Sequence, residues 1–254
     1  MRIGISLAQC GRLARPAAVS AAARAAEQLG YSSVWVCDSV LDPAGVLAAT
    51  APITTRVRLG AILSAASASD PPSLARALST VDVLSDGRLS VALTGDGSRL
   101  DNVLDVLDDC WRDATTPRPV QRPHPPLLLD GAAPEALERA ARRADGWAPG
   151  GLAVDAVAPL WATVRDLAAA HRRDPDRLQL VVRAAIVLGE RAVDGARPSW
   201  HGNADQVADD VDRTRRMGAD EVVLWLTGEL GLDEALDGYA RIAEAAELRA
   251  VQIR

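Results

Sequence analysis

The fold is decided by the stretch Gly30-Tyr31-Ser32-Ser33-Val34-Trp35-Val36-Cys37-Asp38-Ser39. Its centre, 33–37, is a short run of apolar and β-branched side chains, which is typical of a buried strand. The preceding segment, 16–29, has the apolar spacing of a helix, and Gly30 is a common helix terminator. A second helical segment, 43–51, follows. The stretch therefore predicts a strand between two helices, the repeating unit of an α/β protein.

The same alternation continues along the whole chain. We predict strands at 2–7, 33–37, 57–63, 89–94, 126–130, 146–148, 179–187 and 221–226. We predict helices at 16–29, 43–51, 71–84, 97–112, 134–144, 154–171, 204–217 and 232–248. Eight strand–helix pairs in 254 residues favour a closed (β/α)8 TIM barrel, formed as one domain over 1–254. The alternative, a doubly wound open sheet, predicts G-x-G-x-x-G after the first strand, and 9–15 lack that pattern.

Composition excludes several classes of function. The net charge of −6 and an aromatic content of 3% argue against nucleic-acid binding, which needs basic surfaces and stacking side chains. Without lysine, the chain cannot form a Schiff base. Cys10, Cys37 and Cys110 are widely spaced, which is typical of free thiols in a reducing compartment and makes a zinc site unexpected. We expect a cytoplasmic protein without a membrane segment, because the apolar runs are too short for a signal peptide or a span.

In a TIM barrel the active site is built from the loops that follow the strands. These loops offer Gln9, Cys10, Asp38, Ser39, Ser64, Thr94, Asp96, Asp130, Gly131, Trp147, Glu190, Thr227 and Glu229. His201 is the one histidine in such a loop. These side chains do not make a convincing metal site or Ser/His/Asp triad. We therefore expect a barrel that is either inactive or takes its chemistry from a bound cofactor.

Several longer motifs carry a family resemblance. In the first half they are the opening stretch 30–39, Arg56-Val57-Arg58-Leu59-Gly60 and the segment 78–89. In the second half they are 121–126, 130–137 and Ala141-Arg142-Arg143-Ala144-Asp145-Gly146-Trp147, with a weaker match at 201–208. In this order, the motifs resemble the bacterial luciferase-like monooxygenase family, and in particular its branch that uses the deazaflavin coenzyme F420.

The resemblance implies a flavin-type ring bound at the carboxyl ends of the strands. It implies coenzyme F420 as the cofactor, with FMN as the alternative, a small organic substrate and a homodimer. Asp38 and Ser39 would be the catalytic pair, and Gln9, Ser64 and Thr94 would border the ring. The phosphate would be held by Gly131, Ala132 and Ala133, because N–H groups at a helix N-terminus attract anions.

Other interpretations of these residues stay open. Asp38 would either shape the site or cap the next helix, and Ser64 would face the ring or simply pack. The resemblance also has departures: Ser39 stands where the family commonly has histidine, and Asp130 places a negative charge beside the expected phosphate. The loops after the fourth strand and before the fifth are shortened. The alternative function is therefore a degenerate member without turnover that binds a cofactor or a partner.

Overall fold

The computed structural model describes residues 1–7, 14–95, 97–112 and 118–248. Its strands are β1 (Arg2–Leu7), β2 (Ser33–Cys37), β3 (Arg58–Ser64), β4 (Leu89–Thr94), β5 (Leu127–Leu129), β6 (Gly146–Trp147), β7 (Gln179–Leu188), β8 (His201–Gly202) and β9 (Glu221–Leu226). Its helices are α1 (Pro16–Gln28), α2 (Pro43–Thr50), α3 (Pro71–Leu84), α4 (Gly97–Arg112), α5 (Pro134–Arg143), α6 (Val154–Ala170), α7 (Ala204–Arg216) and α8 (Leu232–Ala245). Two short 3-10 turns, Ala51–Ile53 and Pro175–Arg177, complete the order.

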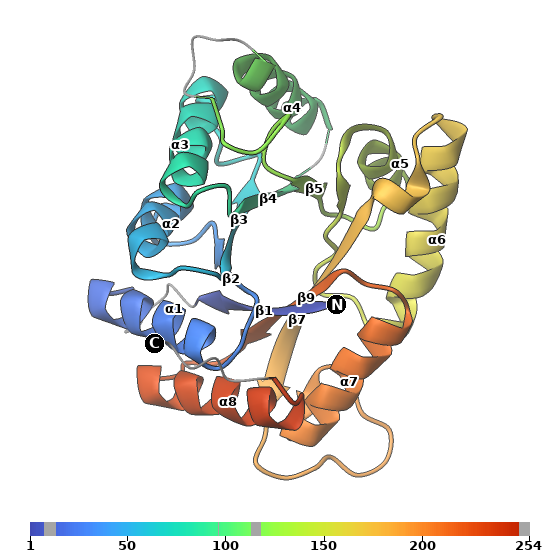
Figure 1. Ribbon diagram of the computed structural model, residues 1–254. Helices are drawn as coiled ribbons and strands as arrows, with labels where there is room; N and C mark the ends of the chain where they lie inside the picture. The colour runs from blue at the N-terminus through green and yellow to red at the C-terminus, as the bar shows by residue number, and fades with distance from the viewer. Residues whose placement is uncertain (8–13, 96, 113–117, 249–254) are drawn as a thin grey trace.

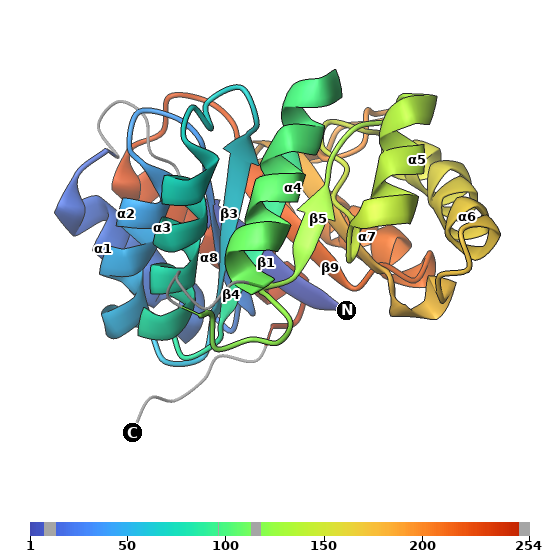
Figure 2. The same cartoon turned by 90° about the horizontal axis from the view of Figure 1, so that it is seen from above.

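The strands close into a parallel barrel, so the predicted (β/α)8 TIM barrel is confirmed. The strand order runs from β6 through β5, β4, β3, β2, β1 and β9 to β7, and β6 also pairs with β7. That last pairing, of Gly146 with Gln179 and Trp147 with Leu180, closes the ring. Figure 1 looks along the barrel and shows the helices surrounding the strands, and Figure 2 shows α4 and α5 from outside. Strand β8 pairs with the end of β7 and stands outside the closed ring.

The helices begin where the sequence supplies caps. The side chain of Asp42 accepts the Gly45 N–H at the start of α2, and Asp70 does the same for Ser73 at the start of α3. Asn203 forms a capping box with Gln206 at the start of α7. Each such side chain satisfies an N–H group that would otherwise lack a partner in the first turn. Within the described part of the chain, no helix is long and apolar enough to cross a membrane.

The apolar side chains form two separate cores. The larger one lies between the strands and the helices, and the smaller one fills the barrel interior. The interior core consists of Trp35, Ile62, Ala92, Leu128, Ala148, Val181 and Val223. Trp35 is 1% exposed, and a Cβ atom on Gly60 would lie 1.9 Å from its ring. Glycine at position 60 therefore lets the indole lie across the barrel.

Polar groups close the barrel below Trp35. The buried carboxylate of Glu221 accepts hydrogen bonds from the Ser33 hydroxyl and from Trp35 Nε1, the latter at 2.8 Å. Arg2 Nε lies 3.0 Å from the same carboxylate. Because the Glu221 carboxylate is paired with a cation and accepts from two donors, the free-energy cost of burying its charge is compensated. The interior core and this cluster close the barrel at the amino ends of its strands. We call the other end, where the carboxyl ends of the strands lie, the mouth.

Candidate functional site

Small side chains line part of the mouth. Inward-facing positions above the interior core include the small side chains of Ser6, Cys37, Ser64, Thr94 and Ala185. Ser6 Oγ and Cys37 Sγ lie 3.6 Å apart across β1 and β2. The core just below carries Trp35, Ile62 and Leu128, which are much bulkier. The sequence thus fills the middle of the barrel with bulky side chains and places small, partly polar groups at this part of its mouth.

Asp38 bridges two neighbouring strand ends. Its carboxylate accepts the N–H of Ser64 at 3.4 Å, and its own N–H donates to the carbonyl of Ile62 at 2.8 Å. The interpretation of Asp38 as the cap of the next helix is wrong, because Asp42 caps α2. Ser39 follows Asp38 and is exposed. Asp38 therefore fixes the β2–β3 side of the mouth, and Ser39 lies beside it in solvent.

Ser64 and Thr94 are neighbours at the ends of β3 and β4. They are paired in register, and the Ser64 hydroxyl accepts the Ala66 N–H at 3.1 Å. The Thr94 hydroxyl donates to the carbonyl of Leu63 at 3.4 Å. The structure therefore brings these two predicted residues together with Asp38. The other predicted ring contact, Gln9, lies outside the described residues, as do Cys10 and Asp96.

An ion pair that the sequence did not reveal crosses the opposite side of the mouth. The guanidinium of Arg183, on β7, pairs with the carboxylate of Asp130, which follows β5. Arg183 Nε also donates to the Ala148 carbonyl at 3.0 Å. A Cβ atom on Gly150 would lie 2.5 Å from Arg183 Nη2, so glycine leaves room for the arginine. The pair thereby links the loops after β5 and β6 to β7.

Some backbone groups of the predicted phosphate loop are already hydrogen-bonded within the protein. The N–H of Gly131 donates to Asp130 Oδ1 at 2.7 Å, and the Gly131 carbonyl accepts from Trp147 Nε1 at 2.8 Å. Gly131 has φ +110°, and a Cβ atom there would lie 2.6 Å from that of Ala136. Helix α5 then begins at Pro134 without a side-chain cap. The anion prediction therefore rests on the exposed segment at Ala132 and Ala133 and on the helix end.

Trp225 is a second mouth residue that was not predicted. Val223 belongs to the interior core, and Leu224 and Leu226 belong to the outer one, so alternation turns Trp225 inward. Its side chain is nevertheless 49% exposed, because it lies at the open end of β9. The alternation of 221–226 was visible in the sequence and could have identified this residue.

Tyr239 lies behind the mouth and is structural. Its hydroxyl donates to the Ser6 carbonyl at 2.9 Å and accepts the Leu226 N–H at 3.4 Å. Burial raises the pKa of this phenol well above its ordinary value. Tyr239 therefore stays protonated at neutral pH and ties β1 to β9.

A groove of about 460 Å³ lies elsewhere, between the loop after β7 and helices α7 and α8. It is lined by Glu190, Asn203, Ala204, Asp205, Arg241, Glu244 and Ala245. Of the residues predicted for the site, this groove contains only Glu190, from the loop inventory. The catalytic and cofactor-binding candidates that the structure describes all lie at the mouth instead.

Comparisons with known proteins agree with this barrel. The model of a family described as luciferase-like monooxygenase matches residues 1–103 and 96–247. An uncharacterized protein of Mycobacterium tuberculosis (strain H37Rv), Rv0953c, is 30% identical over 206 residues, covering 67% of this chain and 72% of the relative.

Three solved structures share the fold. Monooxygenase RslO1 from Streptomyces bottropensis has a TM-score of 0.79 at 21% identity, with 96% of this chain and 98% of that one covered. An F420-dependent secondary alcohol dehydrogenase, solved with an F420–acetone adduct, has a TM-score of 0.75 at 15% identity over 96% and 98%. The F420-dependent tetrahydromethanopterin reductase from Methanopyrus kandleri has a TM-score of 0.76 at 15% identity over 97% and 98%. With the family model matching nearly the whole chain, the protein belongs to the luciferase-like monooxygenase family.

Proposed function

We propose that this protein is an F420-dependent oxidoreductase, with FMN as the alternative cofactor, that transfers a hydride between the cofactor ring and a small organic substrate. Family membership supports an oxidoreductase or monooxygenase. Two proteins with the same fold are named F420-dependent enzymes, which favours F420 over FMN. The assignment of cofactor and reaction to this chain is our own inference.

The observation that carries the proposal is the change of side-chain size along the barrel. Bulky residues such as Trp35 and Leu128 close the interior, whereas Ser6, Ser64 and Thr94 lie above them at the mouth. A planar ring needs an apolar floor that excludes water, and it also needs small side chains around its edge. The residues present therefore fit a flavin-type ring lying on the interior core.

The chain's own groups would then hold and orient the ligands. Asp38, fixed to the Ser64 N–H, and the exposed hydroxyl of Ser39 would hydrogen-bond at the reacting edge. Ala132, Ala133 and the uncapped start of α5 would face the cofactor phosphate. Bound F420 supplies a two-electron hydride donor or acceptor. Hydride transfer depends mainly on positioning, so a mouth with few acid–base groups is adequate.

Direct binding tests the proposal. The purified protein is titrated with F420 and with FMN, and binding is followed by cofactor fluorescence. The matched controls are the deazaflavin chromophore without its phosphate-bearing tail, and riboflavin, which is FMN without its phosphate. We expect saturable binding of F420 that is tighter than binding of its tail-free chromophore. Binding of neither F420 nor FMN would overturn the proposal.

One observation favours the second candidate, a cofactor-binding protein without turnover. The Asp130 carboxylate already occupies the Gly131 N–H, so the loop presents fewer donors to a phosphate than expected. The two functions differ in one measurement. F420 binding without oxidation of chemically reduced F420 by any of a panel of carbonyl and quinone acceptors would favour the second candidate.

A further inference from the structure

The mouth has one wall with a composition unlike the rest. Val187 on β7 pairs in register with His201 on β8, and Ala185 pairs with Trp225 on β9. Side chains at paired positions of parallel strands point to the same face. Because Val181 and Val223 on these strands lie in the interior core, Val187, His201 and Trp225 share the face turned toward the barrel axis. We call these three residues the β7–β9 wall.

The wall exposes apolar surface. Val187 is 47% exposed and Trp225 is 49% exposed, although both follow strand residues that are buried. His201 is half-buried. Large apolar side chains that remain exposed side by side commonly mark a binding site. Trp225 and His201 lie two strand spacings apart and are offset by two residues along β7, so their Cα atoms are roughly 12 Å apart, a gap that a two-ring aromatic molecule between the two side chains can bridge.

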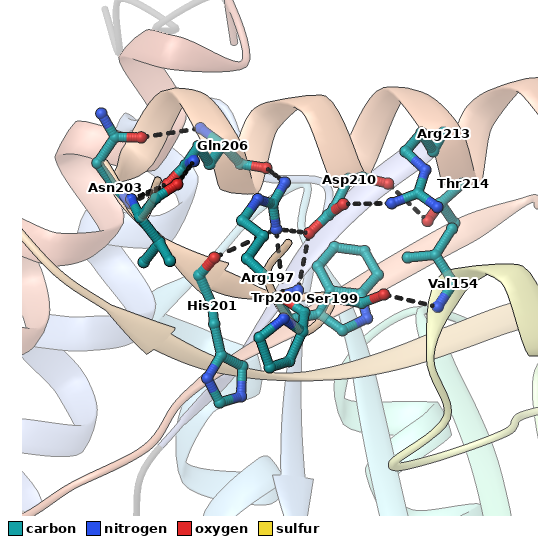
Figure 3. Close-up of polar contacts among 12 residues, drawn as sticks. Val154, Arg197, Ser199, Trp200, His201, Asn203, Gln206, Asp210, Arg213 and Thr214 are labelled. Atoms are coloured by element: carbon teal, nitrogen blue, oxygen red, sulfur yellow. Dashed lines mark hydrogen bonds and ion pairs between the residues drawn. The ribbon is translucent and has the colours of Figure 1, made fainter. Parts of the chain in front are cut away.

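The histidine in this wall is held in place by a buried network (Figure 3). Asp210 is fully buried, and its carboxylate binds Arg197 Nη1 at 2.7 Å and the Trp200 N–H at 2.7 Å. Arg197 Nη1 also donates to the His201 carbonyl at 3.2 Å. In Figure 3 the His201 imidazole extends away from α7, on the side opposite Asp210. The network therefore fixes the backbone and leaves the ring free to meet a ligand.

The residue before His201 is strained. Trp200 has φ +68°, a left-handed conformation that a bulky side chain rarely adopts. Its carbonyl accepts the Val187 N–H at 3.0 Å, which seats β8 against β7. Such strain persists where surrounding contacts impose it, and it is concentrated at functional sites. It is a second observation, independent of exposure, that points to the same wall.

We propose that the β7–β9 wall is the substrate-binding surface, and that it takes a planar aromatic molecule bearing a hydroxyl or carbonyl oxygen. Trp225 stacks on the aromatic ring, Val187 contacts its edge, and His201 hydrogen-bonds to the oxygen. Asp210 and Arg197 are positioning residues that act through His201. The inference rests on the proposed function, since the substrate must lie beside the cofactor in the same mouth.

Three probes of similar size separate these contributions: 2-naphthol, naphthalene without the oxygen, and decahydro-2-naphthol without planarity. Their binding to the full chain is measured in the presence of F420. We expect 2-naphthol to bind about tenfold more tightly than either of the others. Equal affinity for the three probes, or no binding of 2-naphthol, would overturn the proposal.

Variants assign the contacts. Trp225→Ala should weaken 2-naphthol binding about tenfold, and Trp225→Phe should restore most of it. His201→Ala should make 2-naphthol bind no better than naphthalene. Asp210→Asn should reduce the affinity difference between these two probes without abolishing it. His171→Ala, at the C-terminal cap of α6 and paired there with Glu138, is the matched control. Unchanged 2-naphthol affinity in both Trp225→Ala and His201→Ala, with folding confirmed by circular dichroism, contradicts the proposal.

F420 titration of the same variants distinguishes failure of the substrate-surface proposal from failure of the proposed function. Retained F420 binding with lost 2-naphthol binding supports the wall as the substrate surface. Loss of both ligands in Trp225→Ala would assign the tryptophan to the cofactor and overturn the inference alone. Wild-type protein that binds no F420 or FMN overturns the proposed function.

Discussion

Asp130 and Arg183 are 53 positions apart in the sequence and form an ion pair that crosses the mouth of the barrel. The pair spans from the end of β5 to β7, over the loop that follows β6. The second oxygen of the carboxylate binds the N–H groups of Gly131 at 2.7 Å and Gly150 at 3.2 Å. One acid thus sets the positions of two loops, and one cation neutralises it. The β5–β7 side of the mouth is therefore preorganised before any ligand arrives.

Removing the cation should loosen this side. Arg183→Met keeps an unbranched side chain but leaves the carboxylate unpaired, and we expect a loss of about 1–3 kcal/mol in the free energy of unfolding. Urea denaturation at neutral pH measures it. Arg112→Ala, which removes an exposed pair with Asp109, should cost under about 0.5 kcal/mol. Equal losses in the two variants would show that the mouth pair has no special role.

Adding one methyl group inside the barrel should be costly. The Cβ of Gly60→Ala would lie 1.9 Å from the Trp35 ring, which is itself enclosed by the interior core. Overpacking of this kind costs about 1–3 kcal/mol. In a Trp35→Leu background the same substitution should cost less than half as much, because the ring is gone. Gly45→Ala, on the exposed side of α2, is the control: its Cβ would lie 3.2 Å from the exposed Asp42 carboxylate, which can shift, so it should cost much less than Gly60→Ala. Additive costs in the double variant would contradict this explanation.

Local pattern was enough to predict most of the barrel. The strands predicted at 2–7, 33–37, 89–94 and 221–226 have those bounds in the structure. The two strands next to prolines and glycines are shorter than predicted, 127–129 and 146–147. β8 was missed because two residues have no periodicity, so His201 was assigned to a loop.

The site was predicted less completely, for a physical reason. Apart from a few residues near strand ends such as Thr94, only residues after the strands were considered, so Arg183 and Trp225, inside strands but turned to the mouth, were missed. In the sequence alone, Asp130 is a negative charge that would repel the expected phosphate. Its pairing with Arg183 is a long-range contact that no local pattern encodes. The roles predicted for Asp38, Ser39, Ser64 and Thr94 stay predictions.

Glu27 should make stability depend on acid pH. Burial raises the pKa of this carboxyl, but the N–H groups of Arg56, Val57 and Thr55 bind the charged form and lower it overall. A lowered folded-state pKa stabilises the protein above the unfolded value, about 4.3, and this contribution is lost as pH falls through the folded value. Glu27→Gln should therefore cost about 1–3 kcal/mol at neutral pH and progressively less below about pH 4.

Urea denaturation of both proteins across this range measures the difference. Glu229→Gln, at an exposed carboxylate, is the control. A cost of Glu27→Gln that stays constant from neutral to acid pH would show that the charge on Glu27 is not the source.

A negative charge placed at the start of α5 should weaken cofactor binding. Ala132 is exposed, so Ala132→Asp should fold normally, and its carboxylate would repel a phosphate held by the uncapped N–H groups that follow. Charge effects at a helix terminus are about 0.3–1 kcal/mol, so the Kd for F420 should rise about two- to fivefold in dilute buffer. The tail-free chromophore, which lacks the phosphate, should bind both proteins equally. Salt should reduce the difference between the two Kd values, because it screens exposed charges.

Ala162→Asp, exposed on α6, supplies the same charge elsewhere and should leave the Kd unchanged. If Ala132→Asp leaves F420 affinity unchanged in dilute buffer, the phosphate does not bind at this helix end.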